Sequence, residues 1–237
     1  ASMLVMMDES GFVALPCSQD HKRVGEGDVG LNTGGMGAYA PAPVVTDEVY
    51  NRAISEIVKP MYSFLSSQEI PYRGCLYVGL MIATDGSPSV VEYNVRFGDP
   101  ETQVTVPLIS SDLCDLLLAV AEGNLSKTMP SFSNGHALTV VLASEGYPGP
   151  PVKGRVISGN LSSNWSYFPD GKSTIHHAGT GSFDDSIVST GGRVLAATGI
   201  SNKSLEHARE LAYARIADVQ LEGSFFRRDI GNKVLKK

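Results

Sequence analysis

Short apolar or alternating runs of strand length recur along several stretches of the chain, and apolar residues recur with a period of 3.6 along three others, as in helices. The predicted strands cover residues 3–7, 12–15, 74–84, 88–96, 137–144 and 193–198. The predicted helices cover residues 47–67, 112–122 and 204–219. Asp85-Gly86-Ser87 separates two of the strands, so these two are expected to pair as a hairpin.

Each predicted helix carries an apolar stripe that should face a core. The stripes comprise Val49, Ala53, Ile57, Met61 and Leu65 in the first helix, Leu113, Leu116, Leu117 and Val120 in the second, and Leu205, Ala208, Ala212, Ile216 and Val219 in the third. Thr46 is expected to cap the first helix. Pro60 lacks an amide donor, so we expect it to kink or divide that helix.

The mixture of strands and helices predicts an α+β fold. Residues 123–135 are polar, contain Asn, Ser, Gly and Pro, and sustain no apolar period, so they are the expected boundary between two domains. We therefore expect domains at residues 1–130 and 131–237.

The composition narrows the class of protein further. The chain of 237 residues is 42% hydrophobic, as in globular proteins, and its net charge of −6 argues against nucleic-acid binding. No apolar run approaches the ~20 residues that a membrane-spanning helix needs. Cys17, Cys75 and Cys114 match no metal-binding spacing, so we expect buried free thiols and a reducing, cytoplasmic setting. An organellar transit peptide stays open, because the chain starts at Ala1 rather than at Met.

The most informative stretch is VVEYNVRFGDPE at residues 90–101, which contains the end of the strand predicted over residues 88–96. Alternation places Glu92, Asn94 and Arg96 on one face, with neighbouring side chains roughly 7 Å apart. The other face carries an apolar set that should lie on a core, namely Val91, Tyr93 and Val95. Glu92 and Asn94 could hold Mg²⁺ that carries a nucleotide's phosphates, with Arg96 beside the phosphoryl group. The alternative is a salt bridge between Glu92 and Arg96 without chemistry.

Three other motifs are candidates for a substrate site, and each has a plainer interpretation. Gly34, Gly35 and Gly37 either form an anion-binding nest of backbone amides or only permit a tight turn. The run Asp20-His21-Lys22-Arg23 is either a solvated charge run or, through Asp20 above all, a contact for substrate. Asp99-Pro100-Glu101 is either a substrate contact or an ordinary turn before a helix.

Six ordered motifs together resemble one enzyme family, that of phosphoribosylamine–glycine ligase, also called glycinamide ribonucleotide synthetase. The motifs are QDHKR at residues 19–23, NTGGMGAYAPAP at 32–43, VEYNVRFGDPET at 91–102, HAGT at 177–180, GGRVLAATG at 191–199 and FRRDIG at 226–231. The resemblance covers essentially the whole chain, and six ordered motifs are far more specific than one glycine pattern.

The resemblance implies an ATP-grasp fold and a ligation in purine synthesis that uses ATP and Mg²⁺ or Mn²⁺. Glycine's carboxylate would attack the γ-phosphate of ATP, and the amine of 5-phosphoribosylamine would then displace phosphate from glycyl phosphate. The resemblance implies that Glu92 and Asn94 are the metal ligands and that Arg96 and Asp20 are catalytic residues. Related ATP-grasp ligases often carry a second acidic ligand at the position of Leu80. The expected substrate-binding residues are Lys22, Asn32, Thr33, Gly34, Gly35, Asp99, Pro100 and Glu101.

The family enzyme begins with a doubly wound domain and an ATP lid, and neither precedes Ala1 in this sequence. We therefore expect the chain to work only with the missing N-terminal part of the same protein, and to bind small molecules rather than nucleic acid or membrane. Two alternatives stay open. One is a sister ATP-grasp enzyme of purine synthesis, a carboxylase or a formate-dependent transferase, and the other is a non-catalytic module that binds nucleotide.

Overall fold

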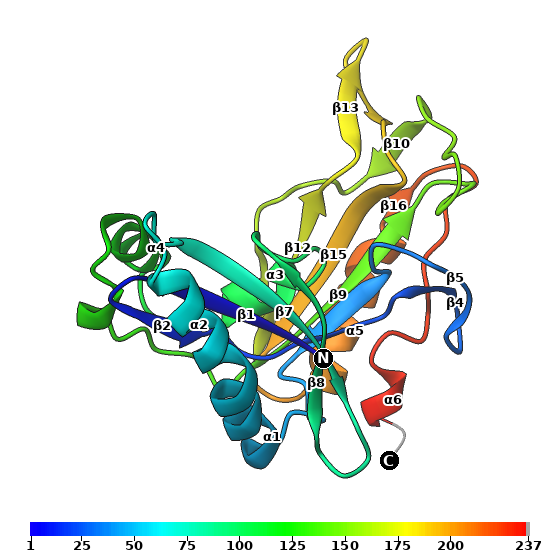
Figure 1. Cartoon of the computed structure of the whole chain (residues 1–237). Helices are drawn as coiled ribbons and strands as arrows, with labels where there is room; N and C mark the ends of the chain where they lie inside the picture. Colours follow the sequence, from blue (N-terminus) through cyan, green and yellow to red (C-terminus); the bar gives the residue numbers. More distant parts are fainter. Residues whose placement is uncertain (236–237) are drawn as a thin grey trace. The chain divides into compact units, whose positions relative to one another are not determined.

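The computed structural model describes residues 1–235, which form two compact units interleaved along the chain (Figure 1). The first unit comprises Ala1–Gln19, Pro41–Gly98 and Thr105–Ser133. The second comprises Asp20–Ala40, Asp99–Val104 and the chain from Asn134 onward. The α+β class is confirmed, since both units combine sheets with helices. The expected domain division at residues 130 and 131 stays a prediction.

The first unit is built on an antiparallel sheet with the strand order β2-β1-β7-β8. Its strands are β1 (Ser2–Asp8), β2 (Gly11–Ala14), β7 (Gly74–Ile82) and β8 (Pro88–Asn94). The central strands β1 and β7 are apolar on both faces, because helices cover both. One core joins alternate residues of these strands to Ala53, Ile57 and Val58, and the other joins the remaining residues to Leu116 and Val120.

The first predicted helix forms as a continuous run of α1 (Asp47–Arg52), the π-helix η1 (Ala53–Val58) and α2 (Lys59–Ser66). Thr46 caps it as predicted, because its hydroxyl accepts a hydrogen bond from the amide of Val49. The helix continues through Pro60 without interruption, but its hydrogen-bond pattern changes in the turn that precedes the proline. The amide of Lys59 bonds the carbonyl of Ile54, five residues back, so the wide turn comes immediately before the residue that has no amide to donate.

A second helix, α4 (Leu113–Glu122), covers the other face of the same sheet. Asp112 caps its start by accepting from the amides of Cys114 and Asp115. The predicted stripe is wrong at Leu117, which is exposed, because the buried face runs through Leu116, Ala119 and Val120. Short elements flank this helix: α3 (Thr102–Thr105), η2 (Val106–Leu108) and η3 (Leu125–Lys127).

The second unit is built on a sheet with the strand order β11-β12-β15-β9-β6-β3. Its strands are β3 (Gln19–Asp20), β6 (Gly37–Ala40), β9 (His136–Ala143), β11 (Ser166–Phe168), β12 (Gly171–His177) and β15 (Arg193–Ser201). Helix α5 (Leu205–Ala217) packs on β9 and β15 through small residues, since Gly199 leaves room for the backbone of Ala208. Val219 lies in the short strand β16 (Val219–Gln220) and not in the helix, which corrects the predicted end.

The remaining elements of the second unit are smaller. A second sheet has the order β13-β14-β10-β16, with β10 (Val156–Gly159), β13 (Thr180–Phe183) and β14 (Ser186–Ser189). Strands β4 (Arg23–Gly25) and β5 (Val29–Asn32) form a separate hairpin, and α6 (Asn232–Leu235) follows the FRRDIG motif. No helix in the described part of the chain has the length and apolar character that spanning a membrane requires.

The cysteines are reduced, but one expectation about them is wrong. Cys17 and Cys75 are buried, and burial raises the pKa of each thiol to about 12. Cys114 is exposed, because it lies on the outward side of the first turn of α4.

Candidate active site

Glu92 and Asn94 project from the same face of β8, as alternation predicts. They lie opposite Gly79 and Tyr77 of β7, and directly opposed residues in an antiparallel pair point to the same side of the sheet. Tyr77 belongs to the core under α4, so Glu92 and Asn94 share the α4 side of the sheet. Glu92 is exposed and Asn94 is half-buried at the end of this edge strand.

Gly79 makes room for the carboxylate of Glu92. A Cβ atom at residue 79 would lie 3.2 Å from Cγ of Glu92 and 3.3 Å from Cε1 of Tyr77, closer than such contacts usually are. The side chains of Glu92 and Tyr77 therefore flank the space over the glycine. The hydroxyl of Tyr77 is in turn 3.0 Å from the hydroxyl of Ser2. Gly79 thus allows Glu92 to lie close to the sheet.

Arg96 reaches the site by a different route from the one predicted. Strand β8 ends at Asn94, and the chain bends at Val95 and Arg96, so Arg96 does not continue the alternation. Its guanidinium still reaches Asn94, because Nη2 lies 3.5 Å from the amide oxygen of Asn94 and Nη1 donates to the carbonyl of Phe97. The amide and the cation are therefore adjacent.

The predicted apolar face of β8 is wrong. Val91 is 63% exposed and Val95 is 72% exposed, and Tyr93 is also exposed, because the cores of this unit cover β1 and β7 but not the edge strand. A β-bulge adds to this effect: Gly79 pairs with Glu92 and Leu80 with Val90, which leaves Val91 as the extra residue.

The donor set fits a hard cation that shares its coordination sphere with another molecule. A carboxylate and an amide oxygen are ligands that Mg²⁺ accepts, and this ion usually completes its shell with water and phosphate oxygens. Among residues 1–235, no three His, Cys, Asp or Glu side chains gather into a site built from protein ligands alone. Leu80 is buried in the core on the opposite face, so a second acidic ligand is absent from that position.

The second group of predicted site residues lies in the other unit, along residues 20–35. Asp20 and Lys22 form an ion pair, with Nζ 3.0 Å from Oδ2. Thr33 also contacts Lys22, because its amide and its hydroxyl both donate to the carbonyl of Lys22, at 2.7 and 2.9 Å. Asn32 is exposed on β5 and pairs with Arg23 of β4. The segment is therefore a closed loop with its polar residues near its base.

The glycines shape this loop, and their amides are already bonded within the protein. The amide of Gly34 donates to the hydroxyl of Tyr147, and the amide of Gly35 donates to the hydroxyl of Thr33, each at 2.9 Å. Gly35 has a φ of +117°, and a Cβ atom there would lie 2.4 Å from Cδ of Pro100. This geometry favours the tight turn over the anion-binding nest.

Arg193 connects the glycine loop to the GDPE motif within the second unit. Its Nη1 donates to the carbonyl oxygens of Gly34 and Asp99, at 2.8 and 2.6 Å, and its Nη2 lies 3.3 Å from the carboxylate of Asp99. The other carboxylate oxygen of Asp99 accepts from the side chain of Gln103 at 2.9 Å. Glu101 is buried, with only 2% of its surface exposed.

The structure thus gathers the predicted residues into two sets. Glu92, Asn94 and Arg96 form one set in the first unit. The set in the second unit comprises Asp20, Lys22, Asn32, Thr33, Gly34, Gly35, Asp99, Pro100 and Glu101. Sequence reasoning missed Gly79, Tyr147 and Arg193. Arg193 lies in the GGRVLAATG motif, but only the fold shows which backbone it meets.

Comparison with known proteins gives two family matches, one after the other along the chain. The family model of the phosphoribosylglycinamide synthetase ATP-grasp (A) domain matches residues 1–102, and that of the C domain of the same enzyme matches residues 137–233. Phosphoribosylamine–glycine ligase from Vibrio parahaemolyticus is 44% identical over all of this chain, which spans 54% of that protein. The chloroplastic enzyme of Arabidopsis thaliana is also 44% identical, with 44% of its length covered.

Solved structures show the same fold. The phosphoribosylamine–glycine ligase of Thermotoga maritima superposes with a TM-score of 0.84 and 36% identity, covering 97% of this chain and 55% of that one. A biotin carboxylase domain from Hydrogenobacter thermophilus shares the fold at a TM-score of 0.62 and 16% identity, covering 95% of this chain and 46% of that one. The chain spans about half the length of the curated relatives above, and it belongs to the phosphoribosylglycinamide synthetase family of ATP-grasp proteins.

Proposed function

We propose that the complete protein joins glycine to 5-phosphoribosylamine at the expense of ATP, and that this chain carries its metal site and its small-substrate site. The observation that carries the proposal is the arrangement of Glu92 and Asn94 on one face of β8, with Arg96 against Asn94. It occurs in a chain whose relatives are named phosphoribosylamine–glycine ligase.

In the proposed reaction the carboxylate of glycine attacks the γ-phosphorus of ATP, and ADP leaves. The amine of 5-phosphoribosylamine then attacks the acyl carbon of glycyl phosphate, so that phosphate leaves and glycinamide ribonucleotide forms. Mg²⁺ supplies charge neutralisation of the phosphates when it is bound. Glu92 and Asn94 would hold the cation by their oxygens, and Arg96 would stabilise negative charge on the transferring group through charge-assisted hydrogen bonds.

The second set of residues is proposed to bind the two small substrates. Asp20 is the preferred contact for a substrate amine, because it is a carboxylate at the base of the loop and its partner Lys22 is exposed to solvent. Lys22, Asn32, Thr33 and Asp99 complete the proposed surface, and Gly34 and Gly35 set its backbone. Pro100 and Glu101 are buried and are proposed to support this surface rather than to form it. The protein is proposed to act in the cytoplasm or in an organelle, as the chloroplastic relative does.

The test is formation of ADP by the complete protein, followed with a coupled assay. We expect ADP formation that requires glycine, 5-phosphoribosylamine and Mg²⁺ together, and a product with the mass of glycinamide ribonucleotide. Formation of ADP that depends on bicarbonate or formate instead would favour a sister ATP-grasp enzyme. Nucleotide binding without turnover under any of these conditions would favour a non-catalytic module.

A further inference from the structure

The FRRDIG motif at residues 226–231 surrounds an arginine that the proposed reaction does not use. Arg227 is 1% exposed, and it is among the largest fully buried side chains in the described residues. A buried guanidinium is costly unless its donors are bonded to acceptors and its charge is balanced. Its Nε and Nη2 form a paired contact with the carboxylate of Asp229, at 2.8 and 2.7 Å. Its Nη1 points elsewhere.

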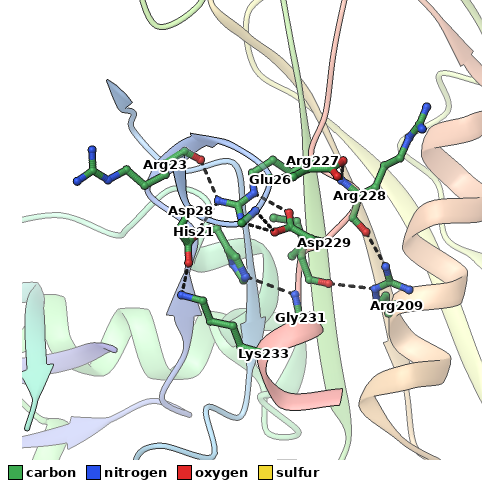
Figure 2. Close-up of polar contacts among 12 residues, drawn as sticks. His21, Arg23, Glu26, Asp28, Arg209, Arg227, Arg228, Asp229, Gly231 and Lys233 are labelled. Carbon is green, nitrogen blue, oxygen red and sulfur yellow. Dashed lines mark hydrogen bonds and ion pairs between the residues drawn. The ribbon is translucent and has the colours of Figure 1, made fainter. Parts of the chain in front are cut away.

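The remaining donor of Arg227 binds the β4–β5 hairpin, some 200 residues earlier in the chain (Figure 2). Nη1 donates to the carbonyl of Arg23 and to the carboxylate of Asp28, both at 2.9 Å. The neighbours of Arg227 repeat this pattern. Asp229 accepts from the amide of Gly27 at 2.8 Å, and the amide of Arg228 donates to Glu26 at 3.0 Å.

This hairpin has little to hold it in place by itself. Its strands have 3 and 4 residues, and isolated two-stranded ribbons are marginal in water. Val29 and Leu31 are 61% and 67% exposed, so the hairpin contributes little apolar burial. The turn between the strands requires positive φ at Gly27 and Asp28. Its order therefore depends on contacts with residues 227–229 and on the ion pair between Lys233 and Asp28.

Between the two anchors lies the segment proposed to bind substrate. Arg227 holds the hairpin at Arg23 and Asp28, and Arg193 holds the chain again at the carbonyl of Gly34. Asn32 and Thr33 lie between these points, and Thr33 closes the loop onto the carbonyl of Lys22. We propose that Arg227 is a positioning residue, which fixes the loop of residues 20–34 so that its side chains meet the small substrates. The inference rests on the proposed function.

The test uses the complete protein with Arg227→Lys, which keeps the charge but loses the forked geometry. The matched control is Arg209→Lys, because Arg209 lies beside the same motif and donates to the carbonyls of Arg228 and Ile230 rather than to the hairpin. Asp28→Gly is the second variant. It removes the carboxylate that Arg227 and Lys233 both bind, and glycine tolerates the positive φ at residue 28, so this variant serves if Arg227→Lys does not fold.

Two measurements are made on each variant. Hydrogen exchange of the amides in residues 23–34 is expected to rise at least about tenfold in Arg227→Lys and Asp28→Gly, and to stay within about threefold in the control. The KM of glycine or of 5-phosphoribosylamine is expected to rise about tenfold, while kcat and the KM of ATP change less than about threefold. If Arg227 contributed only to overall stability, its substitution would not raise the KM of a small substrate while leaving kcat and the KM of ATP unchanged.

The two hypotheses fail in different ways. Unchanged exchange in both variants would overturn the anchoring. Faster exchange with unchanged KM values for both small substrates would overturn the positioning role and leave the proposed ligase function standing. Absence of ligase turnover in the unmodified protein would overturn the proposed function and, with it, the role of Arg227 in binding substrate.

Discussion

At the scale of single residues, the buried side chains of Arg227 and His21 bind loop backbone. His21 lies beside Arg227 and is almost fully buried. Burial, together with the nearby charge of Arg227, lowers the pKa of its imidazole from 6.5 to about 4. Its Nε2 accepts from the amide of Gly231 at 3.4 Å, which only the unprotonated nitrogen can do.

This burial predicts a loss of stability in mild acid. Between pH 6.5 and 4 the unfolded chain binds a proton on His21 and the folded chain does not, so the free energy of unfolding falls as the pH decreases through this window. The loss attributable to His21 is at most about 3 kcal/mol. His21→Gln should flatten this part of the profile, measured by urea unfolding at several pH values. A profile equally steep in the variant would contradict the assignment.

Below pH 4 the free energy of unfolding falls for a different reason, which His21 does not affect. Hydrogen bonds from Arg227 and from the amide of Gly27 lower the pKa of Asp229 from 3.8 to about 2, against the opposing effect of burial. Its contribution is present above pH 3.8 and is lost as the pH falls toward 2. The His21→Gln variant should keep this second loss.

At the scale of elements, the sequence predicts each helix and strand that has a long regular period, and the errors have local causes. The cap Thr46, the pairing of β7 with β8 and the apolar strands β7 and β9 follow from cap and turn chemistry and from short apolar runs. The exposed side of β8 does not, because alternation cannot tell an edge strand from a central one or reveal a bulge. The apolar period also could not predict that α5 ends at Ala217 rather than at residue 219.

The π-helix before Pro60 gives a prediction at this scale. If the wide turn accommodates the proline, Pro60→Ala should change the free energy of unfolding by less than about 1 kcal/mol, mainly through the unfolded chain. If the proline instead strains the helix, the same change should stabilise the protein by about 3 kcal/mol. Thermal unfolding of the variant, with Lys59→Ala as a neighbouring control, separates the two results.

At the scale of the whole molecule, the interleaving of the two units was not predictable from one sequence. Residues 20–40 and 99–104 pack with the chain from residue 134 onward, although they are embedded in the first half. Strand β6 attaches the first of these segments to β9, and Arg193 and Arg227 add hydrogen bonds to carbonyl oxygens 94 to 204 residues away along the chain. The motifs indicated the chemistry of the candidate site, whereas only the fold shows that these arginines hold its loop.

The central claim is that Glu92 holds the cation on which phosphoryl transfer depends. The most direct measurement is glycine-dependent ADP formation by the complete protein over a range of Mg²⁺ concentrations, for Glu92→Gln and for Glu56→Gln. Glu56 is the matched control, because it pairs with Arg52 on the helix surface of the same unit. We expect Glu92→Gln to lose at least about 100-fold in turnover and to need more Mg²⁺, and the control to match the unmodified protein. Turnover of Glu92→Gln within about threefold of the unmodified protein, at the same Mg²⁺ requirement, would contradict the account.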